Sequence, residues 1–498
     1  MTSSVAETPA TYRQPALAEL AAEPPWDLLV IGGGTAGIVG AKTAARFGAR
    51  VLLVDRDHPG GDCLFTGCVP SKSLLAAASA ASNARAASRF GVDVPVVEVD
   101  FRRVMAHVQG AIEHITPTDS AEALEHAGVR VVRGHAELCG RTTAVVDGVV
   151  VSFRQALVAT GAEPMLPPIP GLSEAQALTS ETVWQLRDLP ERLAVLGGGS
   201  IGCELSQAFA RLGSDVVVIE AATALLPRED PDAAAVVTAA LEADGVTVRT
   251  GGGVVEVSSD DGVSGSLVLE SGERLDYDML LVAVGRRPRT AGLGLEVAGV
   301  SVDERGYVVV DDHLRTTNHR VWAAGDLTGH PQFTHVAGVH ASIAATNAVL
   351  GLRRSVAAVV VPRVTFTHPE VAAVGASSGS PGAEHEVRSW PDDEVDRAVA
   401  EGETAGFTKL VTDRRGRIVG ATVVGPRAGE ALAELTLAVT RGLTTTALAG
   451  STHPYPTYGD GPWNAAIADV QRRLARPLAS AAVRTLAATR RWVVSRRG

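Results

Sequence analysis

Hydrophobic and polar positions follow the same order in two separate parts of the chain. Residues 26–57 begin with a short apolar run, pass through a glycine-rich turn into a stretch with helical periodicity, and return to an apolar run that ends at Asp55. Residues 193–222 repeat this order, and their second apolar run ends at Glu220. Short apolar runs bounded by turn residues are typical of buried strands. Each part therefore predicts a strand–helix–strand unit with parallel strands.

The turn in each unit carries three glycines with the spacing G-x-G-x-x-G. These glycines are Gly32, Gly34 and Gly37 in the first unit, and Gly197, Gly199 and Gly202 in the second. Such glycines let the backbone approach a pyrophosphate, whose charge the helix N-terminus attracts, and an acid at the end of the second strand binds a ribose hydroxyl. Asp55 and Glu220 each follow the first glycine of their unit by 23 residues. The chain is therefore predicted to bind two dinucleotides.

The remaining segments are predicted from their periodicity and their turn residues. Residues 76–130 favour helices with a polar break, whereas residues 129–164 and 246–310 favour short strands. From about residue 358, apolar runs typical of strands alternate with one helical segment. Within that part, residues 376–405 are predicted to form a polar loop.

Two cysteines, Cys63 and Cys68, lie behind a glycine pair and ahead of an apolar helical pattern. In a regular helix, residues five apart have Cα atoms about 8.7 Å apart, whereas a disulfide needs about 4.4–6.8 Å. A bond between the two would need a distorted first turn, which Gly67 permits, and would be readily reduced. Thiols at a helix N-terminus also have a lowered pKa. The pair is a candidate redox site, although its spacing alone also fits two buried free thiols.

The run GGDCLFTGCVPSKSLL resembles the redox-active segment of the flavin-dependent pyridine nucleotide–disulfide oxidoreductases, which include dihydrolipoamide dehydrogenase, glutathione reductase and mercuric reductase. The resemblance implies that Cys63 exchanges with substrate and that Cys68 forms a charge-transfer complex with the flavin. It also implies that Lys72 lies beside the flavin N5 atom and pairs with Glu204. A cation there would stabilise negative charge on the reduced flavin.

Other segments match the same family in the same order along the chain. The segment ATG, with Thr160 and Gly161, resembles the point where the chain leaves the flavin domain, and Gly285 lies where it returns from the nicotinamide domain. The resemblance implies that Thr160 and Gly161 contact FAD and that Gly285 contacts NAD. It further implies that Asp326, in the segment AAGD, binds the ribitol of FAD.

The resemblance implies an α/β fold with two Rossmann-like dinucleotide-binding domains and a C-terminal α+β interface domain that forms a homodimer. The expected division is a mobile leader (1–24), the FAD domain (25–160 and 286–355), the NAD(P)H domain (161–285), the interface domain (356–465) and a basic tail (466–498). The cysteine pair follows the first unit, so FAD is assigned to that unit and the nicotinamide cofactor to the second. Glu220 would repel a 2′-phosphate, which favours NADH over NADPH, although Arg228 lies nearby.

Composition narrows the classes of function. The chain has 45 basic and 56 acidic residues, and its net charge of −11 argues against a nucleic-acid-binding protein. Four cysteines in 498 residues are too few for a secreted disulfide scaffold, and the sequence contains neither a signal-peptide pattern nor a long apolar run. We expect a cytoplasmic protein of about three domains with no resident metal ion. Cys139 is expected to be a core or surface thiol without a role in the site, and Cys203 a small apolar residue that faces the helix interior.

The run HPYPTYGD, residues 453–460, departs from the family pattern His-Pro-Thr-x-x-Glu, which reaches into the partner's active site. Alignment on Pro-Thr puts Tyr455 where the histidine belongs and Asp460 where the glutamate belongs. A tyrosine with a pKa near 10 is a poor general base at pH 7. Mercuric reductases also carry a tyrosine here, but they deliver Hg(II) with a C-terminal cysteine pair, and this sequence has no cysteine after Cys203.

These features predict an enzyme that passes hydride from NADH to FAD and then to a Cys63–Cys68 disulfide. The acceptor is predicted to be a metal ion, a quinone or another oxidant, as in a mercuric reductase-like enzyme. A disulfide reductase of the dihydrolipoamide dehydrogenase type is the alternative. A flavin-binding redox sensor or interaction protein with slow turnover is a further alternative from a different class.

The last part of the chain is strongly basic. Residues 466–498 contain eight arginines and one acid, Asp469. A basic amphipathic helix can lie on an anionic membrane surface. The favoured interpretation is a helix that is solvated or that covers an interface.

Overall fold

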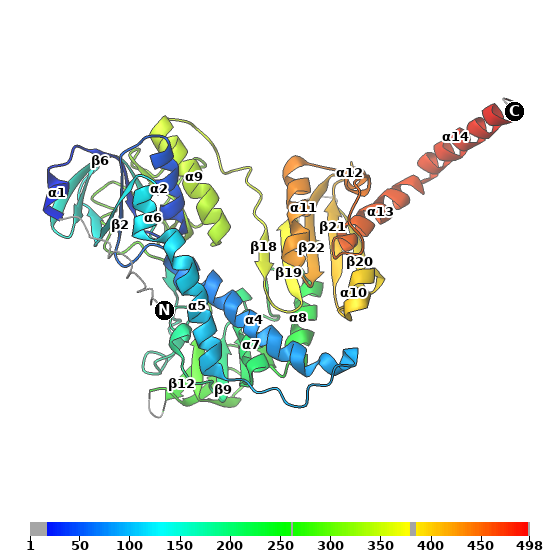
Figure 1. Ribbon diagram of the computed structural model, residues 1–498, viewed down its shortest axis with the longest axis horizontal. Helices are drawn as coiled ribbons and strands as arrows, with labels where there is room; N and C mark the ends of the chain where they lie inside the picture. The colour runs from blue at the N-terminus through cyan, green and yellow to red at the C-terminus, as the bar shows by residue number, and fades with distance from the viewer. Residues whose placement is uncertain (1–16, 260–261, 379–384, 497–498) are drawn as a thin grey trace, which may run out of the picture.

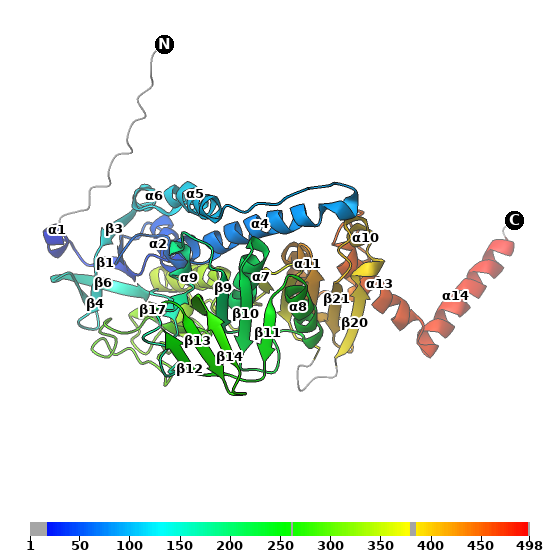
Figure 2. The same ribbon diagram turned by 90° about the horizontal axis from the view of Figure 1, so that it is seen from below.

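The computed structural model describes residues 17–259, 262–378 and 385–496 (Figure 1). Residues 1–16 of the predicted leader lie outside the described residues, and the rest of that segment contains the short helix α1 (Leu17–Ala21). The described chain folds around three main sheets, each covered by helices (Figures 1 and 2).

The first sheet contains both strands of the first predicted unit. Across the sheet, the strands are β3 (Val129–Arg133), β2 (Val51–Asp55), β1 (Trp26–Ile31), β6 (Val149–Val158), β5 (Thr143–Val146) and β4 (Ala136–Leu138), and β17 (Val321–Ala323) also pairs with β6. Strands β3, β2, β1, β6 and β17 pair in parallel, whereas β5 and β4 are antiparallel. Helices α2 (Thr35–Arg46) and α9 (Thr334–Leu350) pack against each other on one face, which buries the inner side chains of β1.

The second sheet contains the second predicted unit and is parallel throughout. Its strands, in order across the sheet, are β11 (Thr247–Thr250), β10 (Asp215–Glu220), β9 (Arg192–Leu196), β15 (Met279–Val282) and β8 (Leu178–Thr179). Helices α7 (Ser200–Leu212) and α8 (Pro231–Ala243) pack their apolar residues into the same core as β9 and β10. An antiparallel meander follows, with β12 (Val254–Ser259), β13 (Gly265–Leu269) and β14 (Arg274–Tyr277).

The two dinucleotide-type sheets are joined by a strand pair and by helices. Strands β7 (Ala162–Pro164) and β16 (Arg286–Pro288) are antiparallel and lie where the chain leaves the first sheet and returns to it. Between β2 and β3, the chain forms α3 (Gly61–Phe65), α4 (Cys68–Arg85), the 3-10 helix η1 (Ala87–Phe90), α5 (Phe101–Asp119) and α6 (Ala121–His126). Helix α4 packs against both α5 and α7, so the cysteine-bearing segment contacts both dinucleotide units (Figure 2).

One helical stretch in the described part of the chain is long and apolar enough to cross a membrane. This stretch is Gly61–Arg85, with a mean hydropathy of 1.2. It includes both cysteines of the candidate redox site, and α4 within it packs against α5 and α7. A single stretch of this kind is weak evidence for a span, because core helices of soluble proteins meet the same criteria.

The third sheet is antiparallel and belongs to the C-terminal part of the chain. Its strands, in order, are β18 (Arg363–Thr365), β19 (Glu370–Gly375), β22 (Ile418–Gly425), β21 (Phe407–Thr412) and β20 (Glu386–Pro391). Helices α11 (Ala428–Arg441), α12 (Thr445–Ala449) and α13 (Asp460–Leu474) share its core. The last helix, α14 (Pro477–Ser495), extends away from the body (Figures 1 and 2).

One expectation about this part is wrong. Residues 385–405 are not a loop, because they contain β20, the 3-10 helix η4 (Asp392–Glu394) and α10 (Asp396–Glu401); residues 379–384 lie outside the described part. The strand lacks apolar alternation because its buried residue is Arg388, whose Nε lies 3.1 Å from the fully buried Asp469. Residue 465, the expected end of the interface domain, lies inside α13, which buries Ala465 and Ala466.

Candidate active site

The two cysteines lie on either side of a break between two helices. Cys63 is in α3 and Cys68 begins α4, and Thr66 and Gly67 separate the helices. A Cβ on Gly67 would lie 2.8 Å from the carbonyl oxygen of Asp62, so only glycine fits this turn without a shift. The helix is therefore interrupted as the sequence predicts. Both cysteines are free thiols in this structure, which therefore describes the reduced pair, and the disulfide stays a prediction.

The pKa values of the two thiols are shifted in opposite directions. A hydrogen bond from Cys63 lowers the pKa of Cys68 to about 6, although burial opposes this shift, and Thr334 and the charge of Lys72 lower it further. The Thr334 Oγ1 atom lies 3.2 Å from the Cys68 Sγ atom. The same hydrogen bond, together with burial, raises the pKa of Cys63. At neutral pH, Cys68 is therefore the thiolate and Cys63 carries the proton.

Lys72 and Glu204 form an ion pair between α4 and α7. The Lys72 Nζ atom lies 2.9 Å from Glu204 Oε2 and 4.2 Å from the centre of the Phe366 ring. The other oxygen of Glu204 accepts a hydrogen bond of 2.9 Å from the backbone amide of Phe366. Glu204 is only 6% exposed, so both of its oxygens need these partners. The pair fixes the Lys72 cation one helical turn beyond Cys68.

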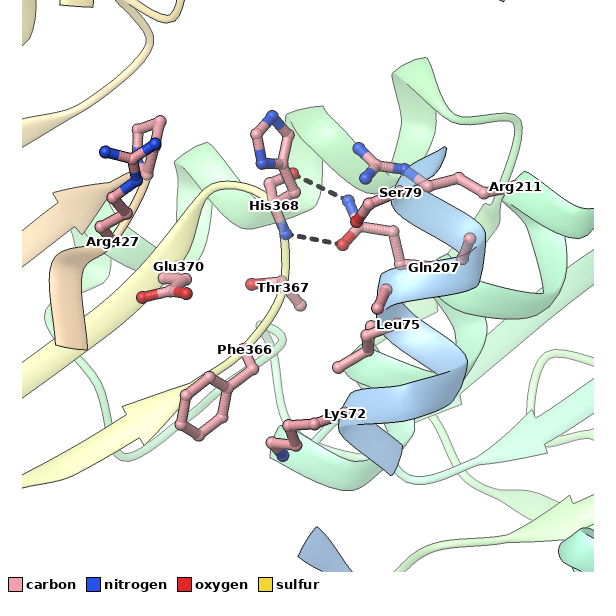
Figure 3. Close-up of a pocket in the computed structure, with 13 residues that line it drawn as sticks. Lys72, Leu75, Ser79, Gln207, Arg211, Phe366, Thr367, His368, Glu370 and Arg427 are labelled. Carbon is pink, nitrogen blue, oxygen red and sulfur yellow. Dashed lines mark hydrogen bonds between the residues drawn. The ribbon is translucent and has the colours of Figure 1, made fainter. Parts of the chain in front are cut away.

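A cavity of about 320 Å³ lies between α4, α7 and the segment after β18 (Figure 3). Lys72 and Phe366 lie at one end of it, and Arg211 and Arg427 lie toward the other. On its wall, the Gln207 side chain donates to the His368 carbonyl over 2.8 Å and accepts from the His368 amide over 2.7 Å. These groups satisfy each other, so we assign no reaction to the cavity.

Both glycine-rich turns fit a dinucleotide. A Cβ on Gly37 would lie 1.8 Å from the oxygen of Gly32, and Gly202 has the same relation to Gly197. Gly32 and Gly197 themselves have φ of +103° and +106°, a region that favours glycine. The caps of α2 and α7 make no side-chain hydrogen bond to their helices, so backbone N–H groups at both N-termini remain available for a pyrophosphate.

The acids at the strand ends support these turns. Asp55 accepts a hydrogen bond from the amide of Gly33. Glu220 accepts from Gly198 over 2.7 Å and from Ala222 over 2.8 Å. A carboxylate has about four acceptor positions, so each acid can also accept from a ribose hydroxyl.

The other predicted cofactor residues surround the junction between the two units. The Thr160 hydroxyl donates to the Arg289 carbonyl over 2.7 Å, and Gly161 accepts from the Arg289 amide. Gly285 has φ of +145° and precedes β16. Asp326 begins the 3-10 helix η3 (Asp326–Thr328), and burial raises its pKa to about 6 although the charge of Arg286 opposes the shift. A buried carboxyl of this kind is suited to a polar ligand group such as a ribitol hydroxyl.

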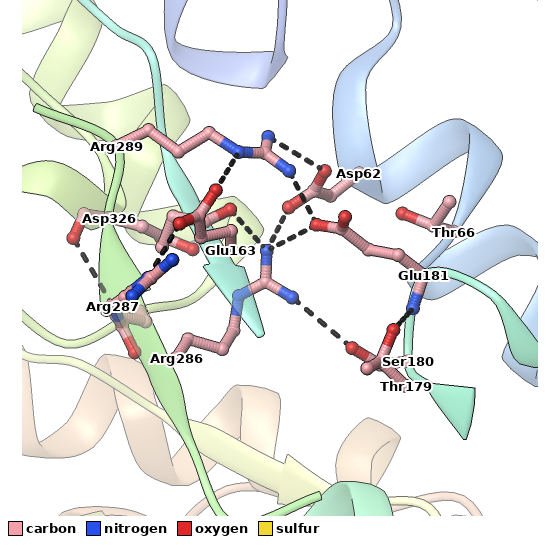
Figure 4. A network of polar contacts seen from close by, with 12 residues as sticks. Asp62, Thr66, Glu163, Thr179, Ser180, Glu181, Arg286, Arg287, Arg289 and Asp326 are labelled. Atoms are coloured by element: carbon pink, nitrogen blue, oxygen red, sulfur yellow. Dashed lines mark hydrogen bonds and ion pairs between the residues drawn. The ribbon is translucent and has the colours of Figure 1, made fainter. Parts of the chain in front are cut away.

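A network of charged side chains next to Cys63 was not found from the sequence (Figure 4). Arg286 forms an ion pair with Asp62 and donates to the Ala162 carbonyl over 2.7 Å. Arg289 pairs with Glu181 at 2.6 Å. The network joins α3 to the junction strands and thereby fixes the cysteine segment relative to the second unit. The sequence does show an acid directly before Cys63 and three arginines within residues 286–289, and these opposite charges are the one signal that could have indicated the network.

Two models of one protein family match the chain. The pyridine nucleotide-disulphide oxidoreductase model matches residues 26–341, and the dimerisation-domain model of these enzymes matches residues 361–466. The chain belongs to this family. It is therefore an FAD-dependent oxidoreductase with NAD(P)H as electron donor, and the dimerisation domain indicates a homodimer. The predicted family and fold class are confirmed.

Relatives in the family carry more than one name. A mercuric reductase of Streptomyces lividans is 38% identical over 447 residues, which cover 87% of this chain and 94% of the relative. A dihydrolipoyl dehydrogenase of Thermus scotoductus is also 38% identical, over 89% of this chain and 96% of its own. Among solved structures, the Cu(II) complex of the HOCl-induced flavoprotein disulfide reductase RclA from Escherichia coli has a TM-score of 0.81 and 28% identity, covering 89% of this chain and 99% of its own.

Tyr455 and Asp460, the two residues predicted from the C-terminal motif of this disulfide oxidoreductase, form hydrogen bonds with other residues. The Tyr455 hydroxyl donates to Asp396 of α10, and this bond raises the pKa of Tyr455. Asp460 is buried at the start of α13 and accepts a hydrogen bond of 3.1 Å from the Thr457 amide. Asp460 therefore supports the turn, and Asp396 is the acid that contacts the tyrosine. No sequence signal identified Asp396, because it lies 59 residues away in the segment predicted as a loop.

Tyr455 lies near the far end of α4 rather than near the cysteines of its own chain. Asp396 belongs to α10, and Glu403 just after α10 pairs with Arg89 of η1 at 2.7 Å. Cys68 begins α4, and 18 residues of helix, about 27 Å, separate it from that end. Tyr455 is also 69% exposed, which suits a residue that contacts a second subunit. The preceding His453 faces elsewhere, with Nε2 2.9 Å from Glu434.

Gly199 offers a direct test of the second nucleotide site. A Cβ at Gly199 would meet no heavy atom within 4 Å, so Gly199→Ala should fold normally. Its methyl group would nevertheless occupy the space through which the backbone approaches a pyrophosphate. We expect KM for the nicotinamide cofactor to rise about tenfold or more, measured by initial rates. Gly110→Ala is the control, since Gly110 is equally open but lies in α5. An unchanged KM in Gly199→Ala would contradict this site.

Proposed function

We propose that this enzyme passes electrons from NADH, through FAD and the Cys63–Cys68 pair, to a soft metal ion such as Hg(II) or Cu(II). The observation that carries the proposal is Tyr455, which the family alignment puts at the position of the histidine and whose hydroxyl donates a hydrogen bond to Asp396. Reduction of a dithiol's disulfide needs a proton donor and acceptor at that position. A phenol whose pKa is raised by a carboxylate serves this role poorly.

The cysteine pair is suited to hold a soft ion. Cys68 is a thiolate at neutral pH, and its neighbour Cys63 lies within hydrogen-bonding distance. Two thiolates form a ligand set that favours Hg(II) and copper ions, and a bound cation would displace the proton of Cys63. FAD, when bound, accepts hydride from NADH and supplies electrons to the cysteine pair. Lys72, held by Glu204, would stabilise negative charge on the reduced cofactor.

The overall reaction balances without a further co-reactant. NADH gives up two electrons and one proton to become NAD⁺. Two electrons reduce one Hg(II) to the metal or two Cu(II) to Cu(I), and the proton is released to solvent. Two names among the similar proteins agree with this class of acceptor: the mercuric reductase of Streptomyces lividans and the RclA structure with Cu(II).

An acceptor comparison tests the proposal. The FAD-loaded dimer is assayed anaerobically for NADH oxidation with four acceptors in separate assays. The acceptors are Hg(II) in a thiol buffer, and Cu(II), lipoamide and a quinone without added thiol. We expect kcat/KM to be highest for one of the two metal ions. Faster turnover of lipoamide than of either metal ion would contradict the proposal.

The second candidate function is a dihydrolipoamide dehydrogenase activity. It is favoured by the 38% identity to the dihydrolipoyl dehydrogenase of Thermus scotoductus, which matches that of the mercuric reductase relative. The absence of an imidazole at residue 455 is the observation against it.

The choice of NADH rests on Glu220. Its carboxylate lies at the end of β10 and accepts from two turn amides, where it would repel a 2′-phosphate. We expect kcat/KM to favour NADH over NADPH by roughly 5- to 150-fold, the equivalent of about 1–3 kcal/mol. Glu220→Gln should narrow this ratio, because it removes the charge that repels a 2′-phosphate. Equal use of both cofactors by the unaltered enzyme would refute the assignment.

A further inference from the structure

Helix α14 has no partner in the described chain. It spans Pro477–Ser495, about 28 Å of helix, and none of its residues is buried. Both views show it extending away from the rest of the molecule (Figures 1 and 2). Large apolar side chains are nevertheless exposed along it: Leu478 by 88%, Leu486 by 70% and Trp492 by 56%. A helix with these side chains in water gains stability when a second surface covers them.

The apolar and basic side chains fall on different sides of α14. At 100° per residue, one arc of about 200° carries the large apolar residues Leu478, Val483, Leu486, Trp492, Val493 and Val494. The opposite side carries Ser480, Arg484, Arg491 and Ser495. Arg490 falls within the apolar arc, where its long side chain can extend its charge toward the polar boundary.

The charge of this segment has one sign only. Residues 470–498 contain eight arginines and no acid. Arg484, Arg490 and Arg491 make no hydrogen bond or ion pair with the described part of the chain, whereas Arg473 and Arg476 just before α14 pair with Asp469 and Glu386. The guanidinium groups on α14 are thus available for an external anionic surface.

We propose that α14 binds the surface of a membrane that contains anionic lipids. Its apolar side would enter the boundary between headgroups and acyl chains, and its arginines would contact lipid phosphates. Trp492, on whose ring Arg496 stacks at 4.1 Å, is the side-chain type that favours this boundary. The helix lies on the surface rather than across it, because its arginines cannot enter the hydrocarbon core at low cost. The inference is independent of the electron acceptor.

The test uses the FAD-loaded, full-length dimer and sedimentation with lipid vesicles. Vesicles of phosphatidylcholine alone are compared with mixed vesicles of phosphatidylcholine and phosphatidylglycerol. We expect binding to the mixed vesicles only, and weaker binding as salt concentration rises. The triple variant Arg484→Gln, Arg490→Gln, Arg491→Gln should bind about 100-fold more weakly, since each arginine near an anionic surface contributes about fivefold.

Two further variants test whether vesicle binding depends on the position of the arginines and on the apolar side of α14, rather than on net charge alone. Arg102→Gln, Arg154→Gln, Arg305→Gln removes the same charge from exposed residues elsewhere and should bind as the unaltered protein does. Leu486→Gln with Trp492→Gln keeps the charge and should also weaken binding. The α14 variants should keep the melting temperature and the NADH-dependent activity, because α14 contributes no buried residue.

Several outcomes would overturn the proposal. These are an absence of binding to the mixed vesicles, equal binding to both kinds of vesicle, or equal loss in the two triple variants. An assembly larger than a dimer in vesicle-free buffer, seen by light scattering and abolished by Leu486→Gln with Trp492→Gln, would also overturn it. That result would assign α14 to a second copy of the chain.

Discussion

Cys63→Ser is expected to lower metal-ion and lipoamide turnover by at least about 10³-fold while NADH still reduces the bound flavin. A serine hydroxyl is neither a soft ligand nor an ionisable nucleophile near neutral pH, so electrons would reach the flavin and go no further. The measurement combines steady-state assays with stopped-flow absorbance of the flavin. Cys139→Ser is the control, because Cys139 is an exposed thiol near the first sheet with no predicted role.

The partner cysteine makes the same account testable by pH. The reduced enzyme should show the long-wavelength absorbance of a thiolate against the flavin, and Cys68→Ser should remove it. The pKa of Cys68 is lowered to about 6, so the thiolate exists above that pH and is protonated as the pH falls through it. The band should therefore fade below about pH 6. A band that survives in Cys68→Ser would contradict the assignment of the two thiols.

Tyr455→His is expected to raise lipoamide reduction by about 10²–10⁴-fold, the usual contribution of a positioned acid–base group. Imidazole titrates near neutral pH, whereas the Tyr455 phenol holds its proton because it donates to Asp396. NADH reduction of the flavin should stay unchanged, because hydride transfer to the flavin needs no proton donor or acceptor at residue 455. Tyr455→Phe should lower metal-ion reduction, since it removes an oxygen that can approach the bound ion.

Tyr458 supplies the matched control for this experiment. It lies three residues further on and donates to Glu401 of α10, so Tyr458→Phe removes the same group from the same surface. It should leave both acceptor activities unchanged. If the unaltered enzyme already reduces lipoamide at a rate typical of enzymes, and Tyr455→Phe has no effect on any acceptor, the role given to Tyr455 is wrong.

The two nucleotide units could be predicted from the sequence because the patterns that specify them are local. The clash that a Cβ on Gly37 or Gly202 would make is with a residue five positions earlier, so the requirement is written in adjacent sequence. The break at Gly67 between Cys63 and Cys68 is local in the same way. Lys72 and Glu204 lie 132 residues apart, and only the family resemblance suggested that they meet.

The contacts that could not be predicted are long-range and polar. Asp62 and Arg286 lie 224 residues apart, and neither the charge of Asp62 nor that of Arg286 specifies its partner. The segment that contains Asp396 was predicted as a loop because β20 and α10 carry no apolar periodicity. The buried residue of β20 is Arg388, whose charge is compensated by Asp469. A buried ion pair replaces the hydrophobic signal that identifies a strand. The family alignment puts Asp460 where the glutamate belongs, but it does not reveal that Asp460 accepts a hydrogen bond from the backbone amide of Thr457.

A single-turnover experiment tests the central claim most directly. The dimer is reduced anaerobically with one equivalent of NADH per flavin. It is then mixed in a stopped-flow instrument with one acceptor, which is Hg(II) in a thiol buffer, or Cu(II) or lipoamide without added thiol. Return of the oxidised flavin spectrum reports delivery of electrons to the acceptor. The account predicts rapid reoxidation by at least one metal ion, loss of that reaction in Cys63→Ser, and slow reoxidation by lipoamide. Rapid reoxidation by lipoamide with no reaction toward either metal ion would contradict it.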